Sequence, residues 1–540
     1  MPVPVPHRIP LFILLLILVW GAWIRLSQLG SNPLSSDEMN HYYVAAALRD
    51  GQGPVLPSGV WYGRGIEYSE MVRASLDRIR PVETAVRLPA AIIGTLCLVA
   101  FALIVWNIAG PWPAVIATLL LALYPEAVRL SRFGRFYTLQ LLVGLLAMYC
   151  GWRVLRDPLE AGDFTVRRLA AHWGWALATL LAFGYATRIQ VTTLSVVAGW
   201  AALVAVVGVL DFHRHRSAAW KWSVSWQLTV LGILALLALS ALVPHLVGEL
   251  IQRARAVPLW ARLGSSSTVM SYYRSLSDSF PLLISLSPLV FLIAILRHWR
   301  TGWFLLAWFA IPVLLHSLVF TWKSERYILL AVPALFLAGG IAAAAGLEAL
   351  GRWLGHRLQQ LTPARAHGLA TVMVGSVALV ALVTTPAFNT SRRIPSTRVS
   401  NGWDESKRII MADPDLARLP LGSAMPLETL HYWGRLDFVV QKALLESWTD
   451  DPADPDDAQP YHMNPVGSPD LYAGRPTLTT PEAIEQAFSA RGAVLIGIQQ
   501  KYWDYNNVEP SLKATLERKA TELCHDRCGT LRLYYWRFQP

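Results

Sequence analysis

The sequence predicts a polytopic α-helical membrane protein with a soluble α/β domain at its C-terminal end. Of its 540 residues, 54% are hydrophobic and only 15% are charged, whereas soluble domains carry about 25% charged residues. Apolar stretches long enough to cross a bilayer recur as far as residue 386. The sequence then becomes polar, acidic and rich in Pro. We therefore expect a transmembrane domain over 1–386 and an extracytoplasmic α/β domain over 387–540.

About eleven apolar stretches are predicted to span the membrane. They are 9–29, 85–108, 112–128, 134–151, 169–186, 190–210, 224–247, 280–296, 302–320, 328–347 and 368–386. The first stretch lacks a convincing small-residue cleavage site, so we interpret it as a signal anchor. We therefore expect this stretch to be the first span of the membrane domain.

Lys and Arg in the short loops set the expected orientation, because cytoplasmic loops carry an excess of positive charge. The loops 152–168, 211–223, 297–301 and 348–367 are basic and contain little acid, so we expect them in the cytoplasm. The long loop 30–84 and the C-terminal domain then lie outside the cytoplasmic (inner) membrane. The net charge of +11 accordingly suggests anionic lipid headgroups as partners. No nucleic-acid-binding motif is present in the sequence.

A short helix is predicted directly after the first span. Ser35 and Glu38 have the spacing of a capping box, and Gly51 and Gly53 would end the helix. Asp37 and Glu38 are neighbours on this helix and point about 100° apart, so they cannot do the same job. One interpretation makes Glu38 the cap and Asp37 a favourable charge at the helix N-terminus; the other makes one of them a catalytic carboxylate. Glu38→Gln should lower turnover less than Asp37→Asn does, since Gln also serves in a capping box.

Basic residues also lie at the expected outer ends of several spans, against the positive-inside bias. Each could be an interfacial anchor or a ligand for an anion at the outer membrane surface. Several of them on the side that carries Asp37 would favour an anion site. These residues are Arg129, Arg132, Arg135, Arg188, Arg253, Arg255, Arg262, Lys323 and Arg326.

The C-terminal domain shows both helix and strand signals. Thr480-Pro481-Glu482 has the cap, the proline and the acidic residue that begin a helix, which should reach about residue 490. The apolar run 494–498 predicts a buried strand, 530–538 a second and 438–440 a third. This alternation indicates an α/β domain.

Two cysteines in this domain, Cys524 and Cys528, could form a local disulfide or contribute to a zinc site. Four good zinc ligands are not in view, and an oxidising compartment favours the disulfide. The acidic run 450–457 matches no EF-hand loop, so we interpret it as a solvated loop. We expect no bound metal.

Several stretches, taken in order, resemble one family. A first span is followed by a long loop that opens with Asp37-Glu38, and then come the stretches 87–94, 131–137 and 325–327. Together they resemble the GT-C-type glycosyltransferases, in particular polyprenyl-phosphate-sugar-dependent protein O-mannosyltransferases and lipid A aminoarabinose transferases. The resemblance covers roughly 9–386. Many relatives continue the first loop with Lys-Pro-Pro, whereas this chain reads Trp-Tyr-Gly-Arg-Gly-Ile-Glu-Tyr at 61–68, so donor and acceptor preferences do not carry over.

The resemblance implies transfer of a sugar from a polyprenyl phosphate to an acceptor hydroxyl on a lipid, glycan or protein of the cell envelope. A carboxylate must take the acceptor proton, and cations must stabilise the phosphate that leaves. Asp37 is the expected base, and Glu38 caps the helix or orients the acceptor. The mechanism should be metal-free, with a divalent cation as the disfavoured alternative. The expected substrate-binding residues are His41, Tyr42, Arg64, Arg132, Arg135, Tyr137, Arg188, Lys323, Glu325, Arg326 and Tyr327.

Two other classes remain as alternatives. A ligase that takes its sugar from a polyprenyl diphosphate would use the same kinds of residues. A lipid or glycan transporter would show internal repeats and polar residues near the middle of its spans. The sequence shows neither, so a membrane glycosyltransferase is the preferred hypothesis.

Overall fold

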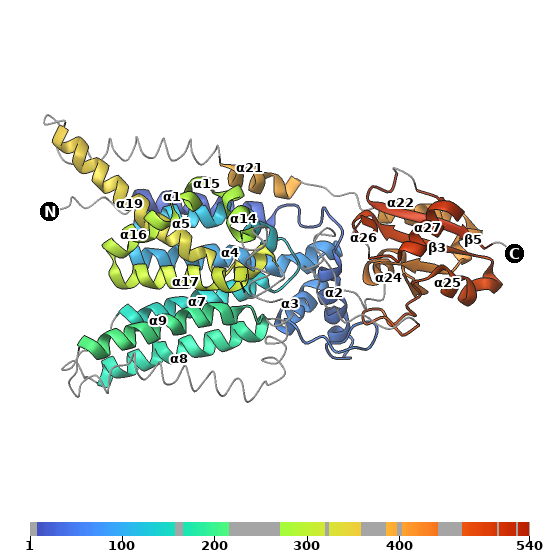
Figure 1. Cartoon of the computed structure of the whole chain (residues 1–540), viewed down its shortest axis with the longest axis horizontal. Coiled ribbons are helices and arrows are strands. Elements are labelled where there is room, and N and C mark those ends of the chain that lie inside the picture. Colours follow the sequence, from blue (N-terminus) through green and yellow to red (C-terminus); the bar gives the residue numbers. More distant parts are fainter. Residues whose placement is uncertain are drawn as a thin grey trace. The chain divides into compact units, whose positions relative to one another are not determined.

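The computed structural model describes residues 8–156, 166–214, 270–318, 323–357, 385–396, 402–440, 467–504, 507–524 and 527–538 (Figure 1). The chain divides into two compact units. The first, which we call the helical unit, contains Met1–Ser27 and Ala90–Ser396, and the second, the mixed unit, contains Gln28–Pro89 and Thr397–Pro540. Most of the long loop 30–84 therefore clusters with the C-terminal residues. The predicted domains 1–386 and 387–540 stay a prediction.

The helical unit contains five helices that are long and apolar enough to cross a membrane, among the described residues. These are α1 (Arg8–Leu26), most of α4 (Val82–Ala109), α7 (Tyr137–Arg156), α17 (Trp299–Leu318) and α19 (Val332–Arg357). Two further helices, α8 (Val166–Ile189) and α9 (Thr193–Arg214), pack against α7 and α17 respectively. The chain is an integral membrane protein with a helical fold; the predicted count of eleven spans is not confirmed.

Prolines break two of the predicted spans. The stretch 112–128 forms α5 (Pro111–Leu123) and α6 (Pro125–Ser131), which are bent by 65°. Pro125 opens α6 because a proline cannot donate a backbone hydrogen bond and drives the residue before it out of helical geometry. The stretch 280–296 likewise divides into α15 (Pro281–Ser285) and α16 (Ser287–Arg297). The predicted span 224–247 and residues 368–384 of the predicted span 368–386 lie outside the described residues, and only residues 385 and 386 at the end of the second span are described.

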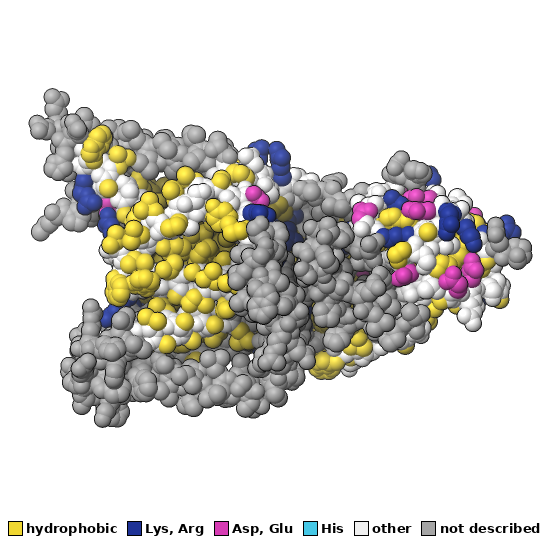
Figure 2. All heavy atoms as spheres, viewed as in Figure 1, with side chains coloured by type: hydrophobic (Ala, Val, Ile, Leu, Met, Phe, Trp, Pro, Cys, Tyr) yellow, Lys and Arg dark blue, Asp and Glu magenta, His cyan; other side chains and the backbone are white. Residues whose placement is uncertain are grey.

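The described surface of the helical unit is largely apolar. Figure 2 shows hydrophobic side chains gathered over its described face, and exposed leucines include Leu289, Leu292 and Leu296 of α16. Such a continuous apolar surface suits lipid rather than water. Inside the unit the helices approach closely: a Cβ on Gly340 of α19 would lie 2.6 Å from the carbonyl oxygen of Pro113 in α5.

The mixed unit contains a five-stranded sheet in the order β2-β1-β3-β5-β4. The strands are β1 (Leu421–Ser423), β2 (Phe438–Val439), β3 (Ala493–Gln499), β4 (Ala520–Glu522) and β5 (Leu531–Arg537). β1 pairs in parallel with β2 and β3, whereas β5 is antiparallel to β3 and β4. β3, β5 and β2 occupy the residues where the sequence predicts strands. All seven residues of β3 are buried, which explains its nearly continuous apolar run.

Helices flank this sheet in the same unit. They are α22 (Trp403–Ala412), α23 (Pro414–Arg418), α24 (Pro426–Trp433), α25 (Pro481–Phe488), α26 (Gln500–Asp504) and α27 (Pro510–Lys519). α25 begins as predicted, because the Thr480 side chain accepts a hydrogen bond from the backbone of Ala483. Cys524 and Cys528 are joined in a disulfide with their Cα atoms 5.5 Å apart. The acidic run 450–457 lies outside the described residues.

The first loop adds α2 (Ser36–Arg49) and α3 (Ile66–Leu76) to the mixed unit. α24 is their main partner from the C-terminal part. The Tyr43 hydroxyl of α2 donates to the carbonyl oxygen of Leu427, and the backbone N–H of Leu34 donates to the Tyr432 hydroxyl at 2.7 Å. The helix that begins with Asp37 is thus built into the same unit as the sheet.

Candidate functional site

The first turn of α2 has the predicted capping box. The backbone N–H of Ser35 donates to Oε2 of Glu38 at 2.9 Å, which satisfies one of the unpaired N–H groups at a helix start. The helix runs for 14 residues to Arg49, close to the length the sequence predicts. The local sequence alone therefore accounts for where this helix begins.

Glu38 also forms an ion pair that the sequence analysis did not anticipate. Nε of Arg87 lies 2.7 Å from Oε1 of Glu38, and Nη2 lies 2.9 Å from Oε2. The two side chains are only 8% and 2% exposed. The other Arg87 N–H groups donate to the carbonyl oxygens of Leu29, Asn32 and Pro33. Of the two roles expected for Glu38, the geometry therefore favours the cap, since both oxygens are held away from solvent.

Asp37 lies next to this ion pair but points in another direction, because neighbouring helical residues project about 100° apart. It is half-buried, whereas Glu38 is 1% exposed. Its position in the first helical turn favours the charged form of its carboxylate. Asp37 is thus the carboxylate of the pair that remains reachable by a substrate.

The other first-loop candidates differ in accessibility. His41 is fully buried, with Nδ1 2.8 Å from the hydroxyl of Ser69 and its ring edge-on to Tyr68 at 5.1 Å. Tyr42 is half-buried and packs edge-on against the ring of His431 at 4.8 Å. Arg64 is exposed. His41 thus has a packing role that joins α2 to α3.

The helical unit holds a pair of arginines around one tyrosine ring. Arg135 is 3% exposed and lies before α7, with its Cζ 5.6 Å from the ring centroid of Tyr137. Arg326, in α18 (Glu325–Ile328), places its Cζ 5.7 Å from the same centroid and 5.3 Å from that of Tyr327. Two segments about 190 residues apart thus bring two guanidinium groups to one phenol ring. We call these residues the arginine pair.

The remaining predicted cations have other surroundings. Arg132 donates from Nη1 to the carbonyl oxygens of Ile24 and Ser27 at the C-terminal end of α1. Lys323 donates from Nζ to the carbonyl oxygens of His316 and Ser317 at 2.6 and 2.9 Å. Arg188 is exposed near the end of α8. The structure therefore groups Arg135 and Arg326 together and places Arg132 and Lys323 against the ends of helices.

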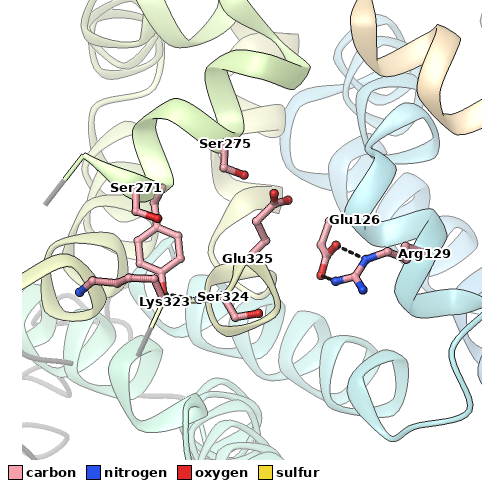
Figure 3. Close-up of a pocket in the computed structure, with 8 residues that line it drawn as sticks. Glu126, Arg129, Ser271, Ser275, Lys323, Ser324 and Glu325 are labelled. Carbon is pink, nitrogen blue, oxygen red and sulfur yellow. Dashed lines mark hydrogen bonds and ion pairs between the residues drawn. The ribbon is translucent and has the colours of Figure 1, made fainter. Parts of the chain in front are cut away.

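A polar cavity of about 410 Å³ lies in the helical unit beside α18 (Figure 3). Glu126 and Arg129 of α6 line it as a bidentate ion pair, with both N–O distances 2.7 Å. Figure 3 shows Glu325 pointing between Ser275 and Glu126, and Lys323 extending to the opposite side. The remaining lining residues are Ser271, Tyr272 and Ser324. Burial raises the pKa of Glu325, and the negative charge of Glu126 raises it further.

Sequence reasoning named Arg129 among the outer basic residues but missed Glu126 of α6 and the cavity residues of α14 (Ser271–Ser279), and it missed Arg87 as a partner of Glu38. Arg87 lies inside the stretch 87–94 that carries the family resemblance, so the resemblance could have marked Arg87 as a candidate site residue. Glu126-Arg129 has the i,i+3 spacing of an acid–base pair on a helix. The serines of α14 offer no comparable signal. Among the described residues, no group of three or more His, Cys, Asp or Glu side chains is arranged so that it could hold a metal ion.

Comparison with solved structures identifies the fold. The structure of ArnT from Cupriavidus metallidurans bound to undecaprenyl phosphate matches with a TM-score of 0.55 at 14% identity, covering 98% of each chain. The archaeal oligosaccharyltransferase AglB from Archaeoglobus fulgidus, in complex with an inhibitory peptide and a dolichol-phosphate, matches with a TM-score of 0.53 at 12% identity. That match covers 98% of this chain and 74% of AglB. No protein-family model matches the chain, and no curated protein is similar to it in sequence. The chain has the GT-C fold that ArnT and AglB share, as the resemblance predicted.

Proposed function

We propose that this protein is a membrane glycosyltransferase that moves a sugar from a polyprenyl-phosphate donor to an acceptor hydroxyl at the outer face of the cytoplasmic membrane. The observation that carries the proposal is the first turn of α2. One carboxylate, Glu38, is fixed by Arg87, while the next, Asp37, is half-buried at the positive end of the helix. In a GT-C fold, this helix start would hold Asp37 rigidly in place as a general base.

The proposed reaction begins when the acceptor hydroxyl attacks C1 of the donor sugar. Asp37 takes the hydroxyl proton as the new glycosidic bond forms and the bond from C1 to the phosphate oxygen breaks. The polyprenyl phosphate leaves as a monoester with one more negative charge. The helix N-terminus holds Asp37 ionised, which makes it a weak base, so the acceptor must lie close and well oriented.

The arginine pair is the proposed site for the donor phosphate. A guanidinium group offers two parallel N–H donors to a phosphate, and two such groups match the charge that develops on the leaving group. Arg135 is almost fully buried, so its charge acts in an environment of low dielectric. ArnT is bound to undecaprenyl phosphate in its own structure, which supports an anionic lipid as the donor here.

The polar cavity is the proposed site for the donor headgroup. Glu325 lines it, and Arg326 follows directly in the same short helix. A sugar attached to a phosphate at Arg326 would therefore have the Glu325 carboxyl group one residue, and the Ser324 hydroxyl group two residues, from its anchor in the chain. Such groups recognise sugar hydroxyls, which both donate and accept hydrogen bonds. Glu325→Gln should weaken use of a sugar-bearing donor more than binding of the bare lipid phosphate.

The decisive experiment measures transfer by the purified full-length protein from a panel of defined polyprenyl-phosphate sugars. Asp37→Asn keeps the size of the side chain and its ability to cap, so the fold should survive while turnover falls by roughly 10²-fold or more. Asp50→Asn is the matched control, because Asp50 lies at the other end of the same helix with its side chain 55% exposed. It should retain wild-type turnover.

Two outcomes would overturn parts of this proposal. Near-normal turnover of Asp37→Asn would remove its role as the base and direct the search to Glu67 or Glu70 of α3. Transfer only from polyprenyl-diphosphate sugars, included as a second panel, would favour a polyprenyl-diphosphate-dependent ligase. No transfer from any donor would end the glycosyltransferase hypothesis.

A further inference from the structure

A buried carboxyl group from the C-terminal part of the mixed unit contacts the first turn of α2. Glu428 of α24 is 2% exposed, and its Oε1 accepts a hydrogen bond from the hydroxyl of Ser36. The hydroxyl of Tyr502, in α26, lies 3.1 Å from the same Ser36 oxygen. Ser36 directly precedes Asp37. Two segments of the C-terminal part thus meet the first turn of α2, 392 and 466 residues away in sequence, beside the proposed base.

The surroundings of Glu428 favour its neutral form. Its other oxygen, Oε2, is buried and accepts no hydrogen bond from the part of the chain that the structure describes, and a buried carboxylate with an unpaired oxygen is costly. Burial raises the pKa of Glu428. The hydrogen bonds from Ser36 and from its own backbone N–H and the charge of Lys501 lower it, and the charge of Asp37 raises it, with a net rise. Burial also raises the pKa values of Tyr502 and Tyr43, which therefore remain neutral hydroxyls.

Among the described residues, the charged and titratable groups that act on Glu428 come from two helices. They are Asp37 and Tyr43 of α2, and Lys501 and Tyr502 of α26. Asp37 carries the only negative charge in this set, so ionisation of Glu428 would place a second one beside it. A neutral Glu428 avoids that repulsion and can still hold Ser36.

We propose that Glu428 is a positioning residue for Asp37: as a neutral acid it holds Ser36, together with Tyr502, and fixes the first turn of α2. The inference rests on the proposed role of Asp37 as the base. It assigns a task to the C-terminal part of the chain, which supplies both Glu428 and Tyr502. Ionised Glu428 would repel Asp37 and loosen the turn that carries it.

The first test is independent of transfer activity. Thermal unfolding of the full-length protein is followed against pH for the wild type and for Glu428→Gln, which cannot ionise. A carboxyl whose pKa is raised in the folded state stabilises the fold below its ordinary value, and this contribution is lost as the pH rises through the raised value. The wild type should therefore lose stability relative to Glu428→Gln as the pH rises above 4.5. If the stability of the wild type and that of Glu428→Gln change with pH in parallel, Glu428 is not a neutral acid in the folded protein and the proposal fails.

Two controls make this first test specific. Glu517→Gln removes an exposed glutamate from α27 in the same unit and should track the wild type at every pH. Asp37→Asn removes the negative charge that faces Glu428, so the pH-dependent loss should move to lower pH. An unchanged position of that loss in Asp37→Asn would show that the two carboxyl groups do not interact and would overturn the proposal.

The second test asks whether Glu428 positions the helix. Hydrogen exchange at the amides of 36–40 should be about 10-fold faster in Glu428→Ala, which leaves Ser36 without its partner, and unchanged in Glu428→Gln. In the transfer assay, Glu428→Ala should lower kcat with little change in the donor KM, and Glu428→Gln should restore kcat. Wild-type exchange in Glu428→Ala would overturn the positioning role even if the protein transferred no sugar at all.

Discussion

The buried ion pair between Glu38 and Arg87 gives the sharpest prediction for stability. Arg87→Met removes the guanidinium group but keeps much of its apolar stem. It removes the ion-pair partner of the Glu38 carboxylate, which is 1% exposed, and keeps the contacts of that carboxylate to Ser35. An uncompensated buried charge of this kind typically costs about 3–5 kcal/mol. The carbonyl oxygen of Leu29 also loses its buried donor, so the cost should lie at the upper end of that range.

A surface pair in the same unit provides the control. Nε of Arg73 lies 2.7 Å from Oε2 of Glu70 in α3, a distance equal to the shorter one between Arg87 and Glu38. Its side chains are 46% and 43% exposed, however. Solvent screens such a pair, and its loss typically costs about 0–1 kcal/mol. Arg73→Met should therefore be nearly neutral.

The assay is chemical unfolding of the purified full-length protein in detergent, followed by tryptophan fluorescence. The wild type is compared with Arg87→Met, Arg73→Met, Glu38→Gln and the double variant Glu38→Gln with Arg87→Met. The double variant should be more stable than the sum of the single losses predicts, because removing both charges leaves none buried and unpaired. If Arg87→Met costs no more than Arg73→Met, the pair does not anchor α2 and this reasoning fails.

The same pair changes the expectation for Glu38→Gln. The sequence predicts a milder loss of turnover than for Asp37→Asn, since Gln can serve in the capping box. In the structure, Arg87 donates to both oxygens of Glu38. Gln offers one oxygen and would turn an amide N–H group toward a guanidinium donor, so we now expect a clear loss of stability.

Three further predictions concern other parts of the chain. A reporter fused after Pro540 should be active outside the cytoplasm, because the loop charges place the C-terminus there; activity only inside would refute the orientation. Mass spectrometry without reductant should find Cys524 and Cys528 bridged, and two free thiols at these positions would contradict this. Arg135→Ala and Arg326→Ala should each lower kcat/KM for the donor by about 10²-fold. Lys at either position should rescue only partly, because it lacks the bidentate fork; wild-type kinetics in both Ala variants would make these arginines simple anchors.

Local sequence chemistry predicted the elements whose signals lie within a few residues. The capping box of Ser35 and Glu38 fixed the start of α2, and Thr480-Pro481 fixed the start of α25. The apolar run of β3 indicated a strand buried on both faces. Hydrophobicity alone was less reliable for spans, because it does not register that Pro125 breaks a helix within an otherwise apolar stretch.

The candidate site required contacts that no local pattern contains. The sequence predicted Asp37 as the base and Arg135 and Arg326 as ligands of the phosphate, but it left the role of Glu38 open between the cap and the acceptor. Glu38 became a structural residue only through a partner 49 positions away. Glu428 contacts Ser36 across 392 positions, so no sequence pattern near either residue predicts the contact. Long-range side-chain pairing is set by the tertiary fold, which binary patterning does not specify at the level of individual partners.

Helix α2 shows why the C-terminal residues matter for the proposed chemistry. The helix is held at its first turn by Arg87 and Glu428 and one turn later by the contact of His41 with Ser69. A base that must act through close approach gains from such fixed geometry, since a displacement of about 1 Å can cost on the order of 10²-fold in rate. One of these anchors, Glu428, comes from the part of the chain beyond residue 397. Removing that part would therefore disturb the first loop directly, and a truncated protein would lose the proposed base geometry along with the sheet.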